Sequence, residues 1–486
     1  MRYQLVIGDL AEKRPRSFSN LIFVVAHALI MVLCRHGTAQ AAEPKPLKVT
    51  REIRALSGSL DKMAVFNSNS PELVTREGIL LSTFPGDRGA SHLDYAFDGR
   101  FDVFSHHVAS SAGSGRKEDL YLGLIVGNTS TRPVQVSVKN AASYLTLPDA
   151  PFIALSPLIA NDDGRVFAGP GDRVTLDLLR ERQGSKWKKT VEVLPGERII
   201  LHKFAIPTSK VKPHLNGRTY ISQLQSSGPV RLALVAGFAR PKRRIARFFA
   251  IFAPLPLITR GKYRAPDKED LLEIFDQGRL IEPRDRPPTS PEDKGPIRYG
   301  RVSGVSIGST WTATLADLDS QYLSLPPPGK TISYVVASLK GATFGTGQDQ
   351  SAPLAVRYKD TAYQANGNYG VKYDLTIPVK NVSDRNLMLN LSLETPVKSD
   401  TKSDTVTFYE PPLRQIFFRG TIKISLLSES DVKVRYVHIV QRRGEMGEPF
   451  FNLPVAAGKE QTVRVEFFYP PDCTPPHLLT LSTAPM

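Results

Sequence analysis

Short runs in which apolar and polar residues strictly alternate recur along this chain, and they limit its possible folds more than any other feature. Residues 134–138, for example, read Val-Gln-Val-Ser-Val. A period of two places one face of the segment in a core and the other in solvent, as in a half-buried β-strand. Residues 128–133 precede this run and contain Asn, Ser and Pro, which favour turns. The sequence therefore predicts strands joined by short turns.

Part of this pattern occurs twice. Residues 128–138 align with residues 381–391 at a constant spacing, with Asn, Ser and Arg at the same positions of both turns. A glycine turn followed by an alternating strand also recurs, at Gly196 and Gly458, at a similar spacing. A glycine turn that leads into an alternating strand is common in β-sandwiches.

A third similarity does not follow the same scheme. Residues 219–235 resemble residues 421–437, but their order relative to the glycine turn differs between the halves. One tandem duplication therefore does not explain all three similarities. Two related β-domains are one interpretation, and a coincidence of generic strand patterns is the other.

The composition changes between the two halves. Residues 267–277 show the clearest helical pattern, with acidic residues in the first turn and Gly278 after the last. Residues 283–296 then contain five prolines among charged residues, which is typical of an extended linker. We predict a mainly β protein with few helices and two β-sandwich-like domains, immunoglobulin-like or jelly-roll-like. The predicted segments are a signal peptide (1–41), a first domain (42–260), a short helix and linker (261–298) and a second domain (299–486).

The first residues indicate export. Residues 13–16 are basic, residues 21–34 are apolar, and the small residues Ala39 and Ala41 follow. This order is that of a secretory signal peptide, and the apolar run is short for a membrane span, which needs about 20 residues. We expect cleavage before Ala42, a periplasmic or extracellular protein, and no membrane span after cleavage. A retained signal anchor is the alternative, since His27 interrupts the apolar run.

The charge of the chain bears on its partners. Its 486 residues carry a formal net charge of +16. Outside the cytoplasm a basic protein meets anionic envelope polymers rather than nucleic acid, so we expect an anionic envelope polysaccharide or an envelope protein as partner and no nucleic acid. A basic run before an aromatic segment is the candidate contact, and a solvated loop is its structural alternative. The run consists of Arg240, Lys242, Arg243, Arg244 and Arg247.

Residues 92–107 concentrate the side chains that could perform chemistry. Imidazoles and carboxylates are potential metal ligands or acid-base groups, but their spacing here matches no metal motif. We therefore predict no metal and no cofactor, and we weigh a weak catalytic site against a structural β-hairpin. The candidates are His92, Asp94, Asp98, Asp102, His106 and His107.

The two cysteines of the chain indicate neither a disulfide bond nor a reactive thiol. Cys34 lies in the predicted signal peptide, so Cys473 remains alone and no internal disulfide is expected. No His or Lys adjoins Cys473 in sequence to lower the pKa of its thiol, which favours an inert residue.

Several motifs together resemble a domain-of-unknown-function family of exported cyanobacterial proteins. The resemblance covers nearly the whole mature chain, and it implies a Gram-negative-type envelope and a periplasmic or extracellular location. It carries no activity, so no catalytic residue can be transferred. The motifs are residues 65–71, 78–85, 99–107, 168–172, 343–347, 366–370 and 468–471.

These observations give one expected function and one alternative. We expect an exported cell-envelope protein with a non-enzymatic binding or structural role. The alternative is a polysaccharide-active hydrolase or lyase that uses the acids and histidines of residues 92–107. A cluster of these groups in one concave pocket would favour the enzyme.

Overall fold

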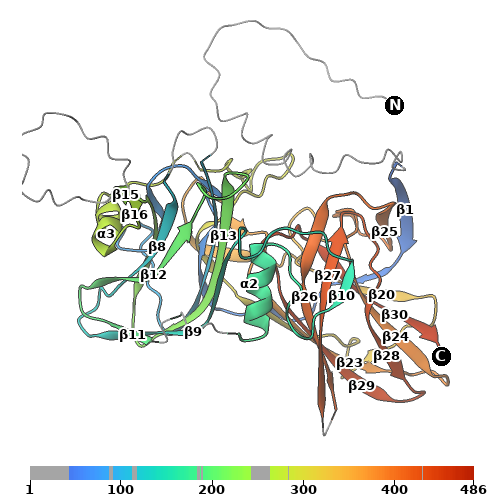
Figure 1. The fold of residues 1–486 in the computed structure, drawn as a ribbon. Helices are drawn as coiled ribbons and strands as arrows, with labels where there is room; N and C mark the ends of the chain where they lie inside the picture. Colours follow the sequence, from blue (N-terminus) through green and yellow to red (C-terminus); the bar gives the residue numbers. More distant parts are fainter. Residues whose placement is uncertain are drawn as a thin grey trace, which may run out of the picture. The chain divides into compact units, whose positions relative to one another are not determined.

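A nine-stranded sheet forms around the first alternating segments, and its strands come from both halves of the chain (Figure 1). The computed structural model describes residues 43–86, 91–111, 118–182, 187, 190–241, 263–282, 284–428 and 431–486. In this part of the chain strands make up 49% and helices 5% of the residues, so the prediction of a mainly β protein is confirmed. The strands of this sheet, in order, are β11 (Thr190–Val193), β9 (Val134–Leu145), β13 (Leu215–Ser226), β7 (Arg100–Ser110), β4 (Ala64–Ser68), β17 (Ser303–Ile307), β21 (Ala352–Arg357) and β22 (Gln364–Ala365), and β5 (Leu73–Val74) pairs with β7.

A four-stranded sheet faces the nine-stranded sheet across one hydrophobic core. Phe101 and Val103 of β7 point into this core, as do Leu122 and Leu124 from the opposite sheet. The four-stranded sheet consists of β12 (Arg198–Ile206), β8 (Leu120–Gly127), β14 (Arg231–Phe238) and β6 (Gly78–Ser82). Strand β9 begins with the buried and exposed alternation that its sequence predicts, whereas β6, β8 and β14 are buried at nearly every residue.

The second half of the chain builds a similar pair of sheets. Side chains of both sheets meet in a second core, which includes Leu375, Ile424 and Leu481. The eight-stranded sheet consists of β10 (Leu158–Ala160), β27 (Val432–Arg442), β26 (Ile416–Leu427), β29 (Glu460–Phe468), β23 (Lys372–Lys380), β18 (Thr310–Thr314) and β3 (Ser59–Leu60), with β19 (Leu323–Ser324) paired to β23. The five-stranded sheet consists of β2 (Glu52–Arg54), β20 (Thr331–Val336), β30 (His477–Pro485), β24 (Leu387–Glu394) and β28 (Pro449–Val455).

Two further strand pairs and two helices complete the described part of the chain. Helix α3 (Lys268–Asp276) confirms the helix predicted over residues 267–277, and Asp267 and Asp270 form its capping box. Helix α2 (Pro170–Leu179) was not predicted; it contacts β9 and β13 on one side and β26 and β29 on the other. The pairs are β1 (Lys45–Thr50) with β25 (Thr405–Glu410) and β15 (Arg240–Pro241) with β16 (Tyr263–Arg264).

Strands from both predicted domains share sheets. Strand β17 follows the proline-rich segment, yet Val305 pairs with Phe66 of β4. Strands β1, β2 and β3, at the start of the described chain, pair with β25, β20 and β18 of the second half. Residues Pro44–Met486 form one compact unit by their contacts. The division into domains at residues 261–298 thus stays a prediction. If it holds, strands of each domain pair within sheets of the other.

Candidate functional site

Strand β7 separates the predicted candidate residues onto opposite faces of its sheet. Because side chains alternate along a strand, Asp102 and His106 lie on one face and His107 on the other. His107 is fully buried, with its Nδ1 2.8 Å from the carbonyl oxygen of Pro71 and its Nε2 3.0 Å from the Ser68 hydroxyl. Burial lowers the pKa of His107 to about 3. His107 is therefore a neutral structural residue without access to a ligand.

His92, Asp94 and Asp98 lie in the irregular stretch before β7. The Nδ1 of His92 is 2.7 Å from the Ser82 hydroxyl. Asp94 adopts a φ of 48° and accepts a hydrogen bond of 2.6 Å from Arg231. Asp98 is exposed beside Gly99. These side chains have different partners, so they do not form one constellation.

Asp102 and His106 share a face of β7, but their surroundings differ. The Nδ1 of His106 lies 2.8 Å from the Thr219 hydroxyl. Asp102 lines a narrow cavity of about 20 Å³, and burial raises the pKa of its carboxyl to about 7. His92 lines a different cavity, of about 300 Å³. The candidates therefore do not meet in one concave pocket.

A buried hydrogen-bonded pair that the sequence analysis missed joins α2 to the second half. Asp172, in the first turn of α2, and His438, on β27, are both fully buried, and His438 Nε2 donates to Asp172 Oδ2 over 2.7 Å. The backbone N–H of Ala168 donates to the same oxygen over 2.8 Å. The two residues are 266 positions apart in sequence, so no local pattern predicts the pair. Its burial excludes substrate access.

Two motifs named in the sequence analysis meet beside this pair. Pro471 and Asp472 pack against the start of α2, where a Cβ on Gly171 would lie 2.8 Å from both Pro471 Cδ and Asp472 Oδ2. Gly169 has a φ of 96°, which favours glycine. A carboxylate at a helix N-terminus is favourable, but burial still raises the pKa of Asp472. The motif glycines therefore permit close packing between the halves.

Cys473 follows directly and is buried. Burial raises the pKa of its thiol well above the ordinary value. The backbone N–H of Arg419 donates to its sulfur over 3.3 Å. These contacts agree with the interpretation of Cys473 as inert.

Arg240 is the one member of the basic run within the described residues; Lys242, Arg243, Arg244 and Arg247 lie outside them. Its guanidinium lies 3.0 Å from Glu77 and 3.9 Å from Asp270. Arg240 is thus engaged in ion pairs within the fold.

The lining of the cavity beside His92 includes three buried rings, those of His92, Phe84 and Phe275. The Phe84 and Phe275 ring centroids are 4.7 Å apart, and those of His92 and Phe275 are 5.4 Å apart. Phe84 is 8% exposed and Phe275 2%, so these rings offer little surface to a ligand. Arg198 at the rim pairs with Asp276 at 2.5 Å.

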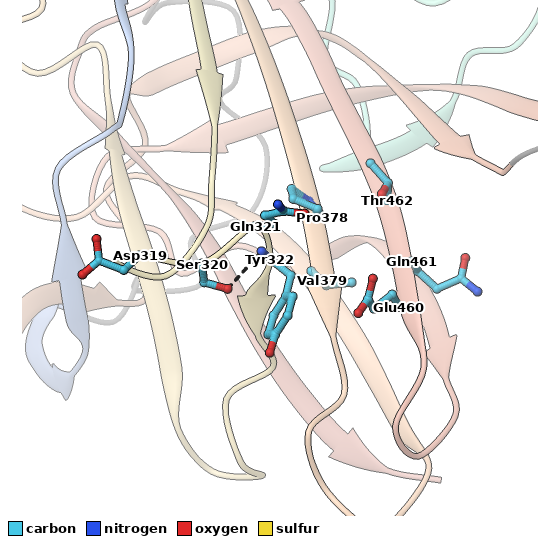
Figure 2. Close-up of a pocket in the computed structure, with 9 residues that line it drawn as sticks. All are labelled: Asp319, Ser320, Gln321, Tyr322, Pro378, Val379, Glu460, Gln461 and Thr462. Atoms are coloured by element: carbon cyan, nitrogen blue, oxygen red, sulfur yellow. Dashed lines mark hydrogen bonds between the residues drawn. The ribbon is translucent and has the colours of Figure 1, made fainter.

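A surface groove lies on the second half of the chain (Figure 2). We call it the Tyr322 groove. It has a volume of about 390 Å³ and lies between the turn before β19 and the paired strands β23 and β29. The amine of Lys380 lies 4.5 Å from the centre of the Tyr322 ring and 2.9 Å from Glu460. The lining residues are Asp319, Ser320, Gln321, Tyr322, Pro378, Val379, Glu460, Gln461 and Thr462.

The sequence analysis missed this groove because its walls are remote in sequence. Residues 319–322 form one wall, and Gln461 comes opposite Val379 only when β29 pairs with β23. A groove that is lined by an aromatic ring and by amide, hydroxyl and carboxyl groups can combine apolar contact with directed hydrogen bonds. No pair of the lining residues has the nucleophile–base arrangement of a covalent catalyst.

Within the described residues, no group of three or more His, Cys, Asp or Glu side chains is placed to hold a metal ion. In that same part of the chain, no helix combines the length and apolarity needed to cross a bilayer.

Comparison with known proteins gives a family. The sequence model of the family described as "Protein of unknown function (DUF3370)" matches residues 51–483. No curated protein matches the chain. The matched range includes both pairs of sheets, α2, α3 and the Tyr322 groove. The chain therefore belongs to the DUF3370 family.

Proposed function

We propose that this protein is an exported, non-enzymatic component of the cell envelope that binds envelope polysaccharide through the Tyr322 groove. The observation that carries the proposal is the lining of that groove. Tyr322 offers a half-buried ring, and Gln321, Gln461 and Thr462 add amide and hydroxyl groups to the lining of the groove. Such groups suit the hydroxyls and apolar faces of sugar rings.

The charge of the chain supports an anionic polymer. The groove itself carries Asp319 and Glu460, and Lys380 neutralises the latter. We infer that the groove contacts sugar hydroxyls, while the basic residues of 240–247 and the net charge of +13 that remains without residues 1–41 supply the attraction to acidic groups. The apolar leader of residues 21–34 supports a periplasmic or extracellular location.

The positions of the predicted catalytic residues argue against the enzyme alternative. A glycosidase needs two carboxyl groups that flank one bond within about 5 to 10 Å. Asp94 pairs with Arg231 at the surface, while Asp102 lines a cavity of about 20 Å³ that is too small for a sugar ring. No described arrangement favours hydrolysis or elimination over binding.

We further infer that each facing pair of sheets is a β-sandwich and that the two sandwiches arose by duplication. One core fills the space between the nine- and four-stranded sheets, and another fills the space between the eight- and five-stranded sheets. A rigid scaffold with binding groups on its loops is typical of β-sandwich binding domains.

The proposal is tested by binding of the mature protein to polygalacturonate, an acidic polysaccharide, with neutral dextran for comparison. Tyr322→Ala should weaken binding about tenfold, since a ring contact and its neighbours contribute about 1 to 2 kcal/mol. Tyr363→Ala is the matched control, because Tyr363 is also a surface tyrosine with a cation, Arg357, stacked 3.8 Å from its ring centre. Equal binding by wild type and Tyr322→Ala would rule out the groove.

A second variant separates the groove from the basic run. Arg243→Glu with Arg244→Glu should weaken binding to polygalacturonate and reduce its salt dependence, since the Debye length falls from about 10 Å at 0.1 M salt to about 3 Å at 1 M. Lys433→Glu with Arg435→Glu makes the same charge change on exposed residues of β27 and controls for net charge. Equal losses in both double variants would mean that the basic run is no specific contact.

A further inference from the structure

The narrow cavity beside Asp102 has a largely apolar lining, into which three segments bring polar side chains, and a fourth segment is hydrogen-bonded to one of them. Asp102 comes from β7 and Asn67 from β4, in the nine-stranded sheet. Ser309 comes from the turn between β17 and β18. Asp61, which follows β3, accepts hydrogen bonds from the Ser309 N–H at 2.8 Å and from its hydroxyl at 3.3 Å.

One of these groups has a buried polar atom without a hydrogen-bond partner in the protein. Asn67 is 5% exposed, and its Oδ1 is buried without a hydrogen-bond partner. It lines the same cavity as Asp102. Asp102 lines the cavity together with Ser309; Asp61 places a second negative charge near it, and Arg100 a positive one. A buried carbonyl oxygen without a donor, close to two carboxylates, is costly unless a further group compensates them.

We propose that Asp102, Asp61, Asn67 and Ser309 bind a hard divalent cation, with Ca²⁺ as the best fit. Carboxylate, amide and hydroxyl oxygens are the ligands of Ca²⁺ and Mg²⁺, and sulfur or imidazole does not contribute to this set. Ca²⁺ accepts irregular geometry with neutral oxygen ligands, whereas Mg²⁺ demands a near-regular octahedron. The cavity, of about 20 Å³, has room for one ion or one water molecule.

The position of this site gives the cation a structural role. Asn67 and Asp102 belong to the nine-stranded sheet, while Asp61 and Ser309 adjoin β3 and β18 of the eight-stranded sheet. The backbone N–H of Asp61 donates to the carbonyl of Thr310 over 2.9 Å, which fixes this side of the site. A bound cation would therefore link the two sheets. This inference does not depend on polysaccharide binding.

The test is the thermal unfolding of the full mature protein, after treatment with EDTA, in CaCl₂, MgCl₂ or neither. Wild type should gain about 3 °C or more at millimolar CaCl₂, given the affinities usual for extracellular calcium sites. MgCl₂ should give a smaller gain. Asp102→Asn should abolish the gain from CaCl₂ and, without cation, should unfold no lower than wild type, since it removes a poorly compensated charge. Asp98→Asn, the same change at an exposed position of the same segment, should keep the full gain.

A second variant should raise the affinity for Ca²⁺, whereas Asp102→Asn should lower it. Asn67→Asp adds a carboxylate to the site, so it should lower the unfolding temperature without cation and increase the gain from CaCl₂. An ordered water in the cavity would not produce the increased gain from CaCl₂. The proposal is overturned if wild type shows no saturable gain from CaCl₂, or if Asp102→Asn gains as much as wild type.

Discussion

His107 and His477 lie fully buried in different cores, and their environments make the neutral imidazole the stable form. Burial lowers the pKa of each to about 3, from an ordinary value of 6.5. His106 adds to the effect at His107, and Lys398 adds to it at His477. Each ring also has a polar contact, to Ser68 at 3.0 Å and to Tyr469 at 2.8 Å. Both histidines therefore act as structural groups.

These histidines should make the protein sensitive to acid. Between about pH 6.5 and pH 3 the unfolded chain binds protons that the folded chain does not, so stability is full above pH 6.5 and falls as the pH is lowered. At pH 5 the loss is on the order of 2 kcal/mol for each histidine. His107→Gln and His477→Gln should each flatten the dependence of unfolding free energy on pH, measured by urea denaturation. His214→Gln, at an exposed position, is the control and should leave this pH dependence unchanged. If the unfolding free energy of both buried variants depended on pH as steeply as that of wild type, the two histidines would not be buried neutral groups.

The repeated turns at Asn128 and Asn381 show the same hydrogen bonds at the scale of the element. The Nδ2 of Asn128 donates to the carbonyls of Arg132 at 2.7 Å and Val193 at 2.9 Å. The Nδ2 of Asn381 donates to the carbonyls of Arg385 at 2.7 Å and Val455 at 2.9 Å. The N–H groups of Gly196 and Gly458 each donate to the carbonyl of the respective asparagine over 2.9 Å. The first two sequence similarities therefore belong to one structural unit that occurs twice.

Because the two turns contain the same hydrogen bonds, loss of either asparagine should lower the free energy of unfolding by the same amount. Asn128→Ala and Asn381→Ala should each lower the free energy of unfolding by about 2 kcal/mol, because each removes the hydrogen bond to a buried carbonyl, that of Val193 or Val455, and a second one to a more exposed carbonyl. Asn386→Ala, an exposed asparagine that accepts one bond from Ala457 N–H, should cost less than about 1 kcal/mol. Urea unfolding measures all three. A large difference between the Asn128 and Asn381 variants would mean that the repeated turns are not equivalent.

Local patterns predicted individual elements better than their pairing. The alternation of residues 134–138 and the capping acids of α3 act over a few residues, so the sequence alone reveals them. The third similarity is not structural: β26 and β27 pair in one sheet, whereas β13 and β14 lie in different sheets. The pairing of β4 with β17, the Asp172–His438 pair and the Tyr322 groove depend on contacts between distant segments, which no local pattern in one sequence encodes.

At the scale of the whole molecule, the exposed linker is open to cleavage, whereas the shared sheets hold the two halves of the chain together. Residues 291–298 are exposed. Arg284, earlier in the linker, is fixed by Asp360 at 2.7 Å and by the Tyr358 ring at 4.0 Å. Strand pairs nevertheless cross the linker in three sheets and in the pair formed by β1 and β25. Cutting the chain in the linker therefore removes one covalent connection and leaves these ladders intact.

This predicts that a chain cut in the linker stays assembled. A protease recognition sequence inserted after Lys294 should be cut readily, since that residue is exposed. The two fragments should then co-elute in size-exclusion chromatography under native conditions and separate only in denaturant, because separation would expose the paired edges of β4 and β17 and the buried Asp172–His438 pair. The uncut protein with the same insertion is the control. Independent elution of the fragments without denaturant would mean that the halves are autonomous domains. The strand pairs between segments on either side of the linker would then contribute little to stability.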